Sequence, residues 1–257
     1  MNFQQSFDEI DEWQHELRRT HAGSAIIRAI ENRIEHESDP VRLRILNFLL
    51  ADEHIAQGNE AAAEAIRRQD PCWEIDSWYD AWPQSNPESD IVPVIEERIR
   101  RETHPMKLST LRFCLAQEHR LRGNYELSEA VYLKMFEEDP DDPMPLIILA
   151  EHKLFGEDHP DEAMRIIDRA IEAALRSGTY RRHALGVKAR IALRLVNYRV
   201  LESVLRQIME LNFTRGNVDV GCERDFLDRL PPGSIDPVVA REYDEYCRAK
   251  GKLPPVI

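Results

Sequence analysis

Glycine is scarce in this sequence, with only ten residues in a chain of 257. The glycines form no dinucleotide fingerprint (G-x-G-x-x-G), no phosphate-binding P-loop and no nucleophile elbow (G-x-S-x-G). The nine histidines are scattered, and none belongs to an H-E-x-x-H zinc motif. We therefore expect a protein that is not an enzyme and that has no catalytic residue, no metal site and no cofactor.

Cysteine and long apolar runs are also lacking. The four cysteines (Cys72, Cys114, Cys222 and Cys247) lie far apart and form no C-x-x-C pair, which is typical of thiols in a reducing cytosol. No apolar run approaches the roughly 18–20 residues needed to cross a bilayer. The first residues are acidic and lack the apolar segment of a secretory signal. The sequence thus predicts a cytoplasmic protein with no membrane partner.

Positive charge is in deficit, since 34 Lys and Arg face 47 Asp and Glu, for a net charge of −13. Nucleic acid is therefore an unlikely partner. The deficit is uneven: residues 1–164 carry a net −18, whereas residues 165–206 carry +7. The basic segment has three interpretations: a solvated face partly paired with acidic neighbours, a contact to an acidic protein or a second copy of this chain, or a phosphate backbone contact. Association of the acidic body with the basic segment in a homo-oligomer explains the asymmetry most economically.

What the sequence does contain is an internal repeat. Shifted by 65 positions, residues 26–59 align with residues 91–124 without a gap, and 16 of the 34 positions are identical. Average residue usage gives on the order of two identities by chance. We interpret the match as a duplication, with a first helical-repeat unit at residues 1–70 and a second at residues 71–142.

The repeated unit has the pattern of helices. Ile26, Ile30 and Ile34 fall on one face at helical spacing, and no stretch alternates apolar and polar residues as a strand does. The predicted helix boundaries in the two copies are N-caps at Ser24 and Ser89, starts at Pro40 and Pro105, and ends at Gly58 and Gly123. The sequence therefore predicts an all-α protein.

One stretch carries a recognisable spacing of small and aromatic residues. Within residues 109–142 these are Leu115, Ala116, His119, Ser128, Tyr132 and Pro140. The spacing resembles the tetratricopeptide (TPR) family, and residues 143–211 continue it with an insertion or deletion near residues 155–162. The resemblance implies a right-handed α-solenoid of antiparallel helix pairs in one continuous domain. Residues 212–257 leave the pattern and predict a loop and a C-terminal capping helix over about residues 236–250.

A Glu-His pair recurs in the two copies, as Glu53-His54 and Glu118-His119. The recurrence follows from the duplication of a whole helix pair, so it is no sign of catalysis. Adjacent residues point about 100° apart around a helix, so Glu and His do not form a ready acid–base pair. We interpret both histidines as packing residues.

The TPR resemblance also implies a concave groove lined by exposed positions of the first helix in each pair. The predicted lining residues are Phe48, Asp52, Ile55, Phe113, Gln117, Arg120, Ile147, Glu151, Leu154, Arg190, Leu193 and Arg194. At positions where some family members clamp a terminal carboxylate with basic and amide groups, this sequence has Phe, Ile, Asp and Glu. They instead suit a peptide or partner helix with apolar anchors, oriented by arginines. We therefore expect a protein-interaction scaffold or adaptor.

Three alternatives remain open at this stage. Trp78 and Trp82 share a helical face and are either core residues or an exposed aromatic anchor for a partner. An acidic inhibitor or immunity-type protein would bind a basic partner through residues 1–164. A nucleic-acid-associated adaptor would use the basic segment 165–206.

Overall fold

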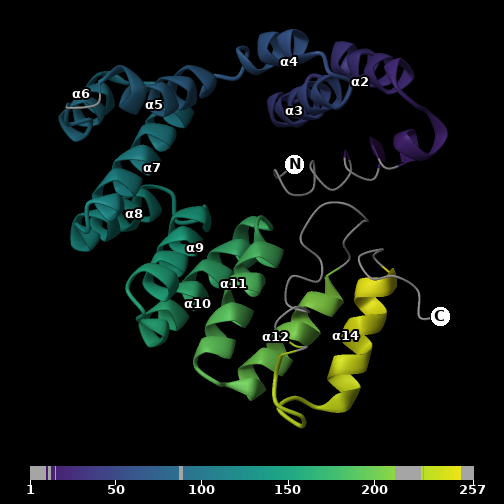
Figure 1. Ribbon diagram of the computed structural model, residues 1–257, viewed down its shortest axis with the longest axis vertical. Coiled ribbons are helices and arrows are strands. Elements are labelled where there is room, and N and C mark those ends of the chain that lie inside the picture. Colours follow the sequence, from purple (N-terminus) through teal and green to yellow (C-terminus); the bar gives the residue numbers. More distant parts are fainter. Residues whose placement is uncertain are drawn as a thin grey trace. The chain divides into compact units, whose positions relative to one another are not determined.

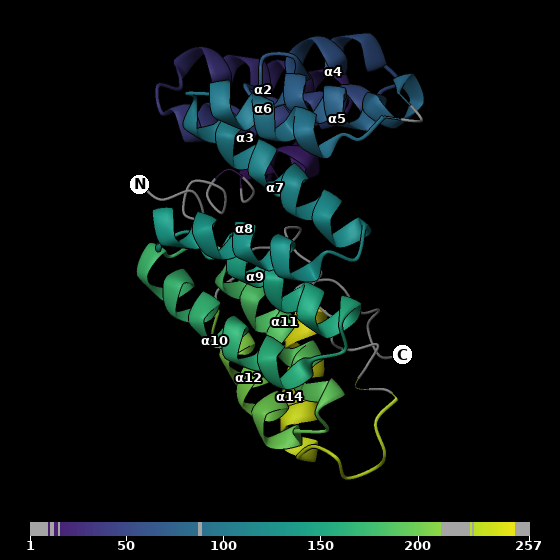
Figure 2. The same ribbon diagram turned by 90° about the vertical axis from the view of Figure 1, so that its left-hand side faces the viewer.

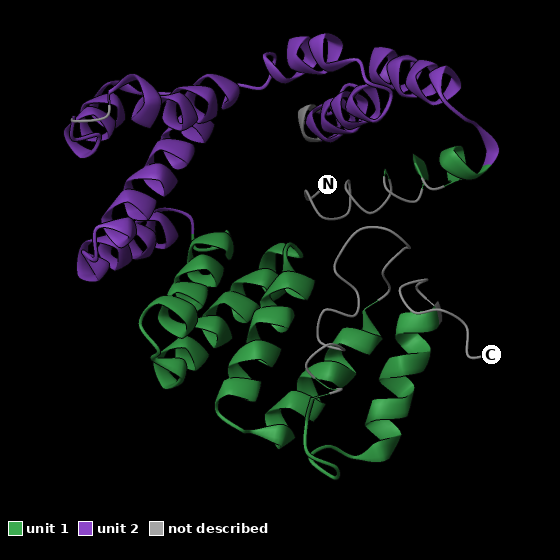
Figure 3. Ribbon diagram, viewed as in Figure 1, with its two compact units in different colours: residues 1–19, 140–257 green, residues 20–139 purple. Residues whose placement is uncertain are grey.

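The computed structural model describes residues 10, 13–14, 16–86, 89–211, 227 and 229–249. Every regular element in this part of the chain is a helix, which confirms the predicted all-α class (Figure 1). The chain divides into two compact units (Figure 3). We call Thr20–Asp139 the repeat unit, and Pro140–Ile257 together with Met1–Arg19 the C-terminal unit.

The repeat unit consists of helices that pack on their neighbours in the chain. They are α2 (Ser24–His36), α3 (Pro40–Ala56), α4 (Glu60–Arg67), α5 (Trp73–Ser85), α6 (Val92–Arg101), α7 (Pro105–Leu121) and α8 (Tyr125–Glu138). Helix α3 packs on α2 and α4, and α7 packs on α6, α8 and α5. Helices α3 and α7 begin and end 65 residues apart, so the duplication in sequence is also one in structure.

The C-terminal unit continues in the same manner. Its elements are α9 (Met144–Glu151), the π-helix η1 (His152–Gly156), α10 (Pro160–Ser177), α11 (Arg181–Arg194), α12 (Tyr198–Glu210) and α14 (Pro237–Ala249). Helices α9 to α12 and α14 pack in chain order, as both views of the ribbon show (Figure 1, Figure 2). Helix α14 confirms the predicted C-terminal helix, while most of the loop predicted before it lies outside the described residues.

The core follows the predicted helix faces. Ile30 and its duplicate Ile95 are both fully buried. Leu46 is also fully buried, and its duplicate Leu111 is only 1% exposed. Burying one such side chain contributes about 1.5–3 kcal/mol, so two equivalent layers stabilise the two copies. Among the described cysteines, Cys72, Cys114 and Cys247 are buried and form no disulfide, and Cys222 lies outside the described residues. None of the described helices combines the length and apolar character that a bilayer-spanning segment needs.

The helix boundaries agree with the sequence in part. The prolines do start α3 and α7, and Gly58 and Gly123 follow the ends of these helices with φ of +75° and +74°. The predicted serine caps are wrong. Gly23 occupies the cap position of α2, so Ser24 is already helical. Before α6 the carboxylate of Asp90, not Ser89, accepts the Val92 N–H at 2.9 Å.

One tight turn recurs at four helix junctions in the described part of the chain. Its first residue has a positive φ, and the N–H of its second residue donates at 2.8 Å to a carbonyl near the end of the preceding helix. The four turns are Gly58-Asn59, Gly123-Asn124, Asp158-His159 and Val196-Asn197. This arrangement satisfies carbonyls that the helix end would otherwise leave without a partner.

Each turn is preceded by a fully buried alanine at nearly constant spacing. The alanines are Ala51, Ala116, Ala150 and Ala189. Gly123 lies seven positions after Ala116, and the first and last turns have the same spacing, but Asp158 lies eight positions after Ala150. The extra residue is accommodated by η1, because a π-helical turn contains one residue more than an α-helical turn. The structure thus places an inserted residue where the sequence suggested an insertion or deletion.

Candidate functional site

The predicted groove residues of the repeat unit lie in different surroundings. Phe48 on α3 is 45% exposed, whereas the ring of Phe113 on α7 packs 5.9 Å from the ring of Tyr132. The Gln117 side chain accepts a hydrogen bond from Arg120 Nε at 3.2 Å, so these two residues form a local pair along α7. Asp52 on α3 forms an ion pair with Arg67 at 3.3 Å.

In the C-terminal unit, the structure corrects one predicted lining residue. Ile147 on α9 is fully buried and belongs to the core, because nearly the whole of this short helix is apolar and enclosed. Glu151 at the end of α9 faces Arg190 of α11, with Oε1 and Nη2 2.5 Å apart. Arg194, one turn further along α11, binds the Asp158 carboxylate through Nη2 at 2.7 and 2.9 Å.

These arginines border an open pocket of about 410 Å³, which we call the Phe155 pocket. Its lining residues are Leu154, Phe155, Asp158, Arg190, Leu193 and Arg194. The pocket brings together four predicted groove residues from η1 and α11. Phe155 and Asp158 were not predicted, because no sequence pattern indicates the π-helix that contains Phe155 and precedes Asp158.

The π-helix places Phe155 at the surface. The phenyl ring is 66% exposed, and the Arg190 guanidinium lies over it at 5.5 Å from the ring centroid. Leu154, the preceding residue, is buried at 5% exposure and forms the floor of the pocket. Asp158 then adopts a left-handed backbone conformation with φ of +55°, which aspartate tolerates better than most residues. Its carboxylate thereby meets Arg194 at the rim.

A buried ion pair supports the π-helical turn. Lys153 Nζ lies 3.0 Å from the Glu157 carboxylate and 3.7 Å from that of Glu162 on α10. The side chains of Lys153 and Glu157 are only 6% and 12% exposed. The carbonyl of Lys153 also accepts the N–H of His159 at 2.8 Å. Side chain and backbone of Lys153 therefore both tie η1 to the turn that follows it.

Glu151, the carboxylate that pairs with Arg190, lies in surroundings that favour its ionised form. Burial opposes ionisation of Glu151, but the interactions with nearby His183 and Arg190 outweigh it, so the pKa of Glu151 lies below its usual value of 4.5. His183 Nε2 is 3.9 Å from the Glu151 carboxylate. The Arg190 Nε atom is buried and has no hydrogen-bond partner among the described residues. Glu151 thus stays ionised and holds the Arg190 side chain in place.

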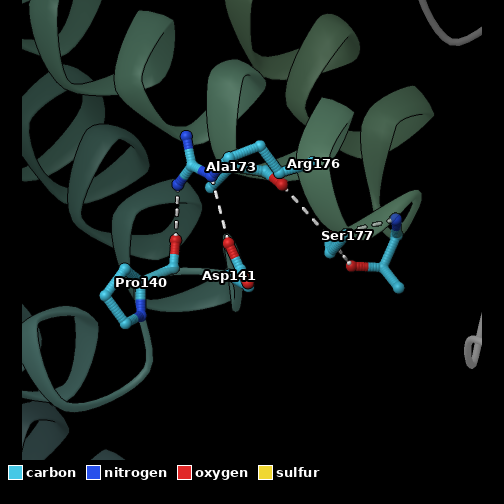
Figure 4. Close-up of polar contacts among 6 residues, drawn as sticks. Pro140, Asp141, Ala173, Arg176 and Ser177 are labelled. Carbon is cyan, nitrogen blue, oxygen red and sulfur yellow. Dashed lines mark hydrogen bonds and ion pairs between the residues drawn. The ribbon is translucent and has the colours of Figure 1, made fainter.

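Many other basic side chains of residues 165–206 also have acidic partners within the chain. At least five of the ten, all in the described part, form ion pairs with carboxylates: Arg176, Lys188, Arg190, Arg194 and Arg206. Figure 4 shows one case, in which Arg176 at the end of α10 donates to the Asp141 carboxylate at 3.0 Å and to the Pro140 carbonyl at 2.7 Å. Here the basic segment anchors the acidic turn before α9.

The tryptophans of α5 lie against the core of the second copy. Trp78 and Trp82 are partly buried and pack on a cluster that includes Ile75, Ile95 and Leu111. Their rings contact each other edge to face at 5.5 Å, and the Arg98 guanidinium covers Trp78 at 3.9 Å. The indole rings are therefore engaged within the repeat unit.

Residues of the repeated Glu-His pairs form hydrogen bonds that stabilise the fold. The carbonyls of His54 and His119 accept the N–H groups of Asn59 and Asn124 in the recurring turn. The Glu118 carboxylate accepts a hydrogen bond from the Tyr79 hydroxyl at 2.7 Å. Burial and this carboxylate together raise the pKa of Tyr79 well above its usual value.

Within the described residues, no group of three or more His, Cys, Asp or Glu side chains is arranged to hold a metal ion. No protein-family model matches this sequence, and no curated protein matches it significantly.

Proposed function

We propose that this chain is a non-enzymatic, cytoplasmic protein-interaction module of the TPR-like type, with right-handed, antiparallel helix pairs. The Phe155 pocket receives an apolar side chain from a peptide or a partner helix. The single observation that supports this role best is the exposure of Phe155 in an open pocket with leucines on its walls and arginines at its rim.

The size and lining of the pocket suit such a ligand. Ligand pockets are mostly apolar, with a few well-placed polar groups, and have volumes of about 300–1,000 Å³. The pocket volume of about 410 Å³ lies within this range. An apolar side chain placed against Phe155, Leu154 and Leu193 would be removed from water, which is the main source of affinity in such contacts.

The arginines contribute orientation more than net charge. Arg190 and Arg194 are already paired with Glu151 and Asp158, so their guanidinium groups are held in one place. A preorganised arginine loses less side-chain freedom when a ligand binds. A polar backbone or carboxylate group of the ligand can therefore approach the rim at a defined position.

The recurring turn supports the TPR-like part of the proposal. Four junctions share one turn, and a buried alanine precedes each at nearly constant spacing, which is the regularity expected when similar helix pairs stack. The ion pairs of residues 165–206 speak against a nucleic-acid adaptor, because at least five of the ten basic side chains there are already paired with carboxylates.

Selection of peptides from a phage-displayed random library, followed by binding measurements on variants, tests the proposal. Phe155→Ser removes the exposed ring, and Leu175→Ser is a matched control, since Leu175 is 55% exposed on α10 and does not line the pocket. We expect enriched peptides to share an apolar anchor, to lose at least about tenfold in affinity for Phe155→Ser and to bind Leu175→Ser normally. No enrichment, or equal binding to both variants, would contradict the proposal.

A further inference from the structure

The repeat unit has a second pocket, of about 350 Å³, which we call the Phe48 pocket. It lies where α3, α4, the turn after α4 and the segment entering α7 meet. Its lining residues are Leu43, Arg44, Asn47, Phe48, Ile66, Arg67, Gln69, Asp70, Pro71, His104 and Met106. Leu43, Phe48, Ile66 and Met106 supply apolar surface, and Phe48 is 45% exposed.

Arg44 gives this pocket a directed positive charge. Its Nε donates to the Asp70 carboxylate at 2.6 Å, and its guanidinium carbon lies 5.4 Å from the centroid of the Phe48 ring. Within the described part of the chain the guanidinium makes no other hydrogen bond, so its two terminal nitrogens can donate to a ligand. A guanidinium held on one edge by a carboxylate presents its other edge in a fixed plane.

The charges of the lining favour an acidic ligand. The lining contains two arginines, Arg44 and Arg67, and one carboxylate, Asp70. Asp52, which pairs with Arg67 at 3.3 Å, does not line the pocket. The lining residues alone therefore carry a formal charge of +1, and the open edge of Arg44 is the group in this pocket that can receive a carboxylate. A guanidinium edge that has no protein partner can form a short-range, charge-assisted hydrogen bond with a carboxylate.

The arrangement around Arg44 repeats the one in the Phe155 pocket. In each pocket an arginine covers an exposed phenylalanine at 5.4 or 5.5 Å. In each, a carboxylate from another helix or turn holds that arginine, at 2.6 Å for Asp70 and 2.5 Å for Glu151. The two sets of residues are not at duplicated positions, so the duplication alone does not explain the similarity.

We propose that the Phe48 pocket is a second binding site, for an internal peptide segment in which an apolar anchor stands next to an acidic side chain. The anchor packs on Phe48 and Ile66, and the carboxylate takes the open edge of Arg44. This inference rests on the proposed role in protein interaction, but it does not depend on the Phe155 pocket.

The test uses a fluorescein-labelled peptide with a Phe-Asp-Asp core, Gly-Ser flanks and an amidated end. Binding is followed by fluorescence anisotropy on the full chain carrying Phe155→Ser, so that the first pocket does not contribute. We expect saturable binding that weakens at least about tenfold with Phe48→Ser or Arg44→Met, because each removes one of the two recognised groups. Peptides with an Ala-Asp-Asp or a Phe-Lys-Lys core should bind at least about tenfold more weakly.

Asp70→Asn is the variant that separates recognition from damage to the fold. The Asp70 carboxylate also accepts the Cys72 N–H at 2.7 Å, and an asparagine oxygen can retain that bond while removing the charge that competes for Arg44. We therefore expect Asp70→Asn to bind the Phe-Asp-Asp peptide several-fold more tightly. Thermal unfolding of each variant reports its folding independently.

Two results would overturn the inference. One is the lack of saturable binding up to about 1 mM peptide, the weakest affinity that a single pocket would be expected to give. The other is equal affinity for the Phe-Asp-Asp and Phe-Lys-Lys peptides together with no gain in Asp70→Asn. Every protein in this test carries Phe155→Ser. The result therefore does not depend on whether the Phe155 pocket binds the peptides of the selection experiment.

Discussion

Gly123 and Val196 occupy the same position in two equivalent turns and share a left-handed backbone, with φ of +74° and +54°. In both turns the next residue, an asparagine, donates its N–H at 2.8 Å to the helix that precedes it. Glycine adopts this conformation at little steric cost, whereas a β-branched residue does so under strain. The chain therefore adopts this turn at residue 196 although valine disfavours a left-handed backbone.

Val196→Gly should consequently stabilise the protein. The valine side chain is 63% exposed, so little burial is lost, and relief of strain is worth about 1 kcal/mol. Denaturant unfolding measures the change in the free energy of unfolding. Val238→Gly is the matched control: Val238 is 43% exposed within α14, and glycine there should destabilise by about 0.5–1 kcal/mol. A loss of stability in Val196→Gly would argue against strain at this turn.

The buried ion pair between Lys153 and Glu157 gives a prediction about the coupling of two charges. Glu157→Gln or Lys153→Met alone leaves one buried charge without its main partner, and each should cost about 2 kcal/mol of unfolding free energy. The double variant removes both charges and should lose far less than the sum of the single changes. A double-mutant cycle measured by denaturant unfolding checks this. If the losses of the two single variants add up to the loss of the double variant, the interaction between the two charges contributes nothing to stability.

Stability at low pH should depend on Glu151. Its pKa in the folded protein lies below the usual 4.5, so the ionised group stabilises the fold above pH 4.5. That contribution is lost as the pH falls through the folded-state pKa, since protonation removes the attraction to Arg190 and His183. Glu151→Gln should therefore be less stable than the wild type at neutral pH, with a difference that shrinks below pH 4.5. Thermal unfolding at a series of pH values measures it; a difference independent of pH would contradict this assignment.

The duplicated half of the fold could be predicted closely from the sequence. The ungapped match between residues 26–59 and residues 91–124 predicts helices in the same register, and the prolines and glycines mark where α3 and α7, which are equal in length, begin and end. Helix α6 ends at the position equivalent to the end of α2 but is three residues shorter. The serine caps failed because neighbours supplied the local geometry instead. Gly23 turns the chain before α2, and the Asp90 carboxylate is better placed than the Ser89 hydroxyl before α6.

The candidate site was less predictable, because its geometry depends on a local irregularity. Nothing in the residues of η1 distinguishes a π-helical turn from an α-helical one, yet that turn decides that Phe155 faces outward. Two of the left-handed turn positions also lack the usual glycine, since Asp158 and Val196 fill them. The ion pairs of Arg190 and Arg194 join residues 36–39 positions apart, a distance that helical periodicity does not reach.

The most direct measurement is an NMR titration of the methyl-labelled protein with a peptide enriched in the selection. We expect the methyl signals of Leu154 and Leu193 to shift with one shared affinity, while those of Leu175 on α10 and Leu43 in the Phe48 pocket stay unchanged at equimolar peptide. Phe155→Ser should abolish the shifts. Shifts confined to methyl groups away from Leu154 and Leu193 would contradict the claim that the Phe155 pocket holds the apolar anchor.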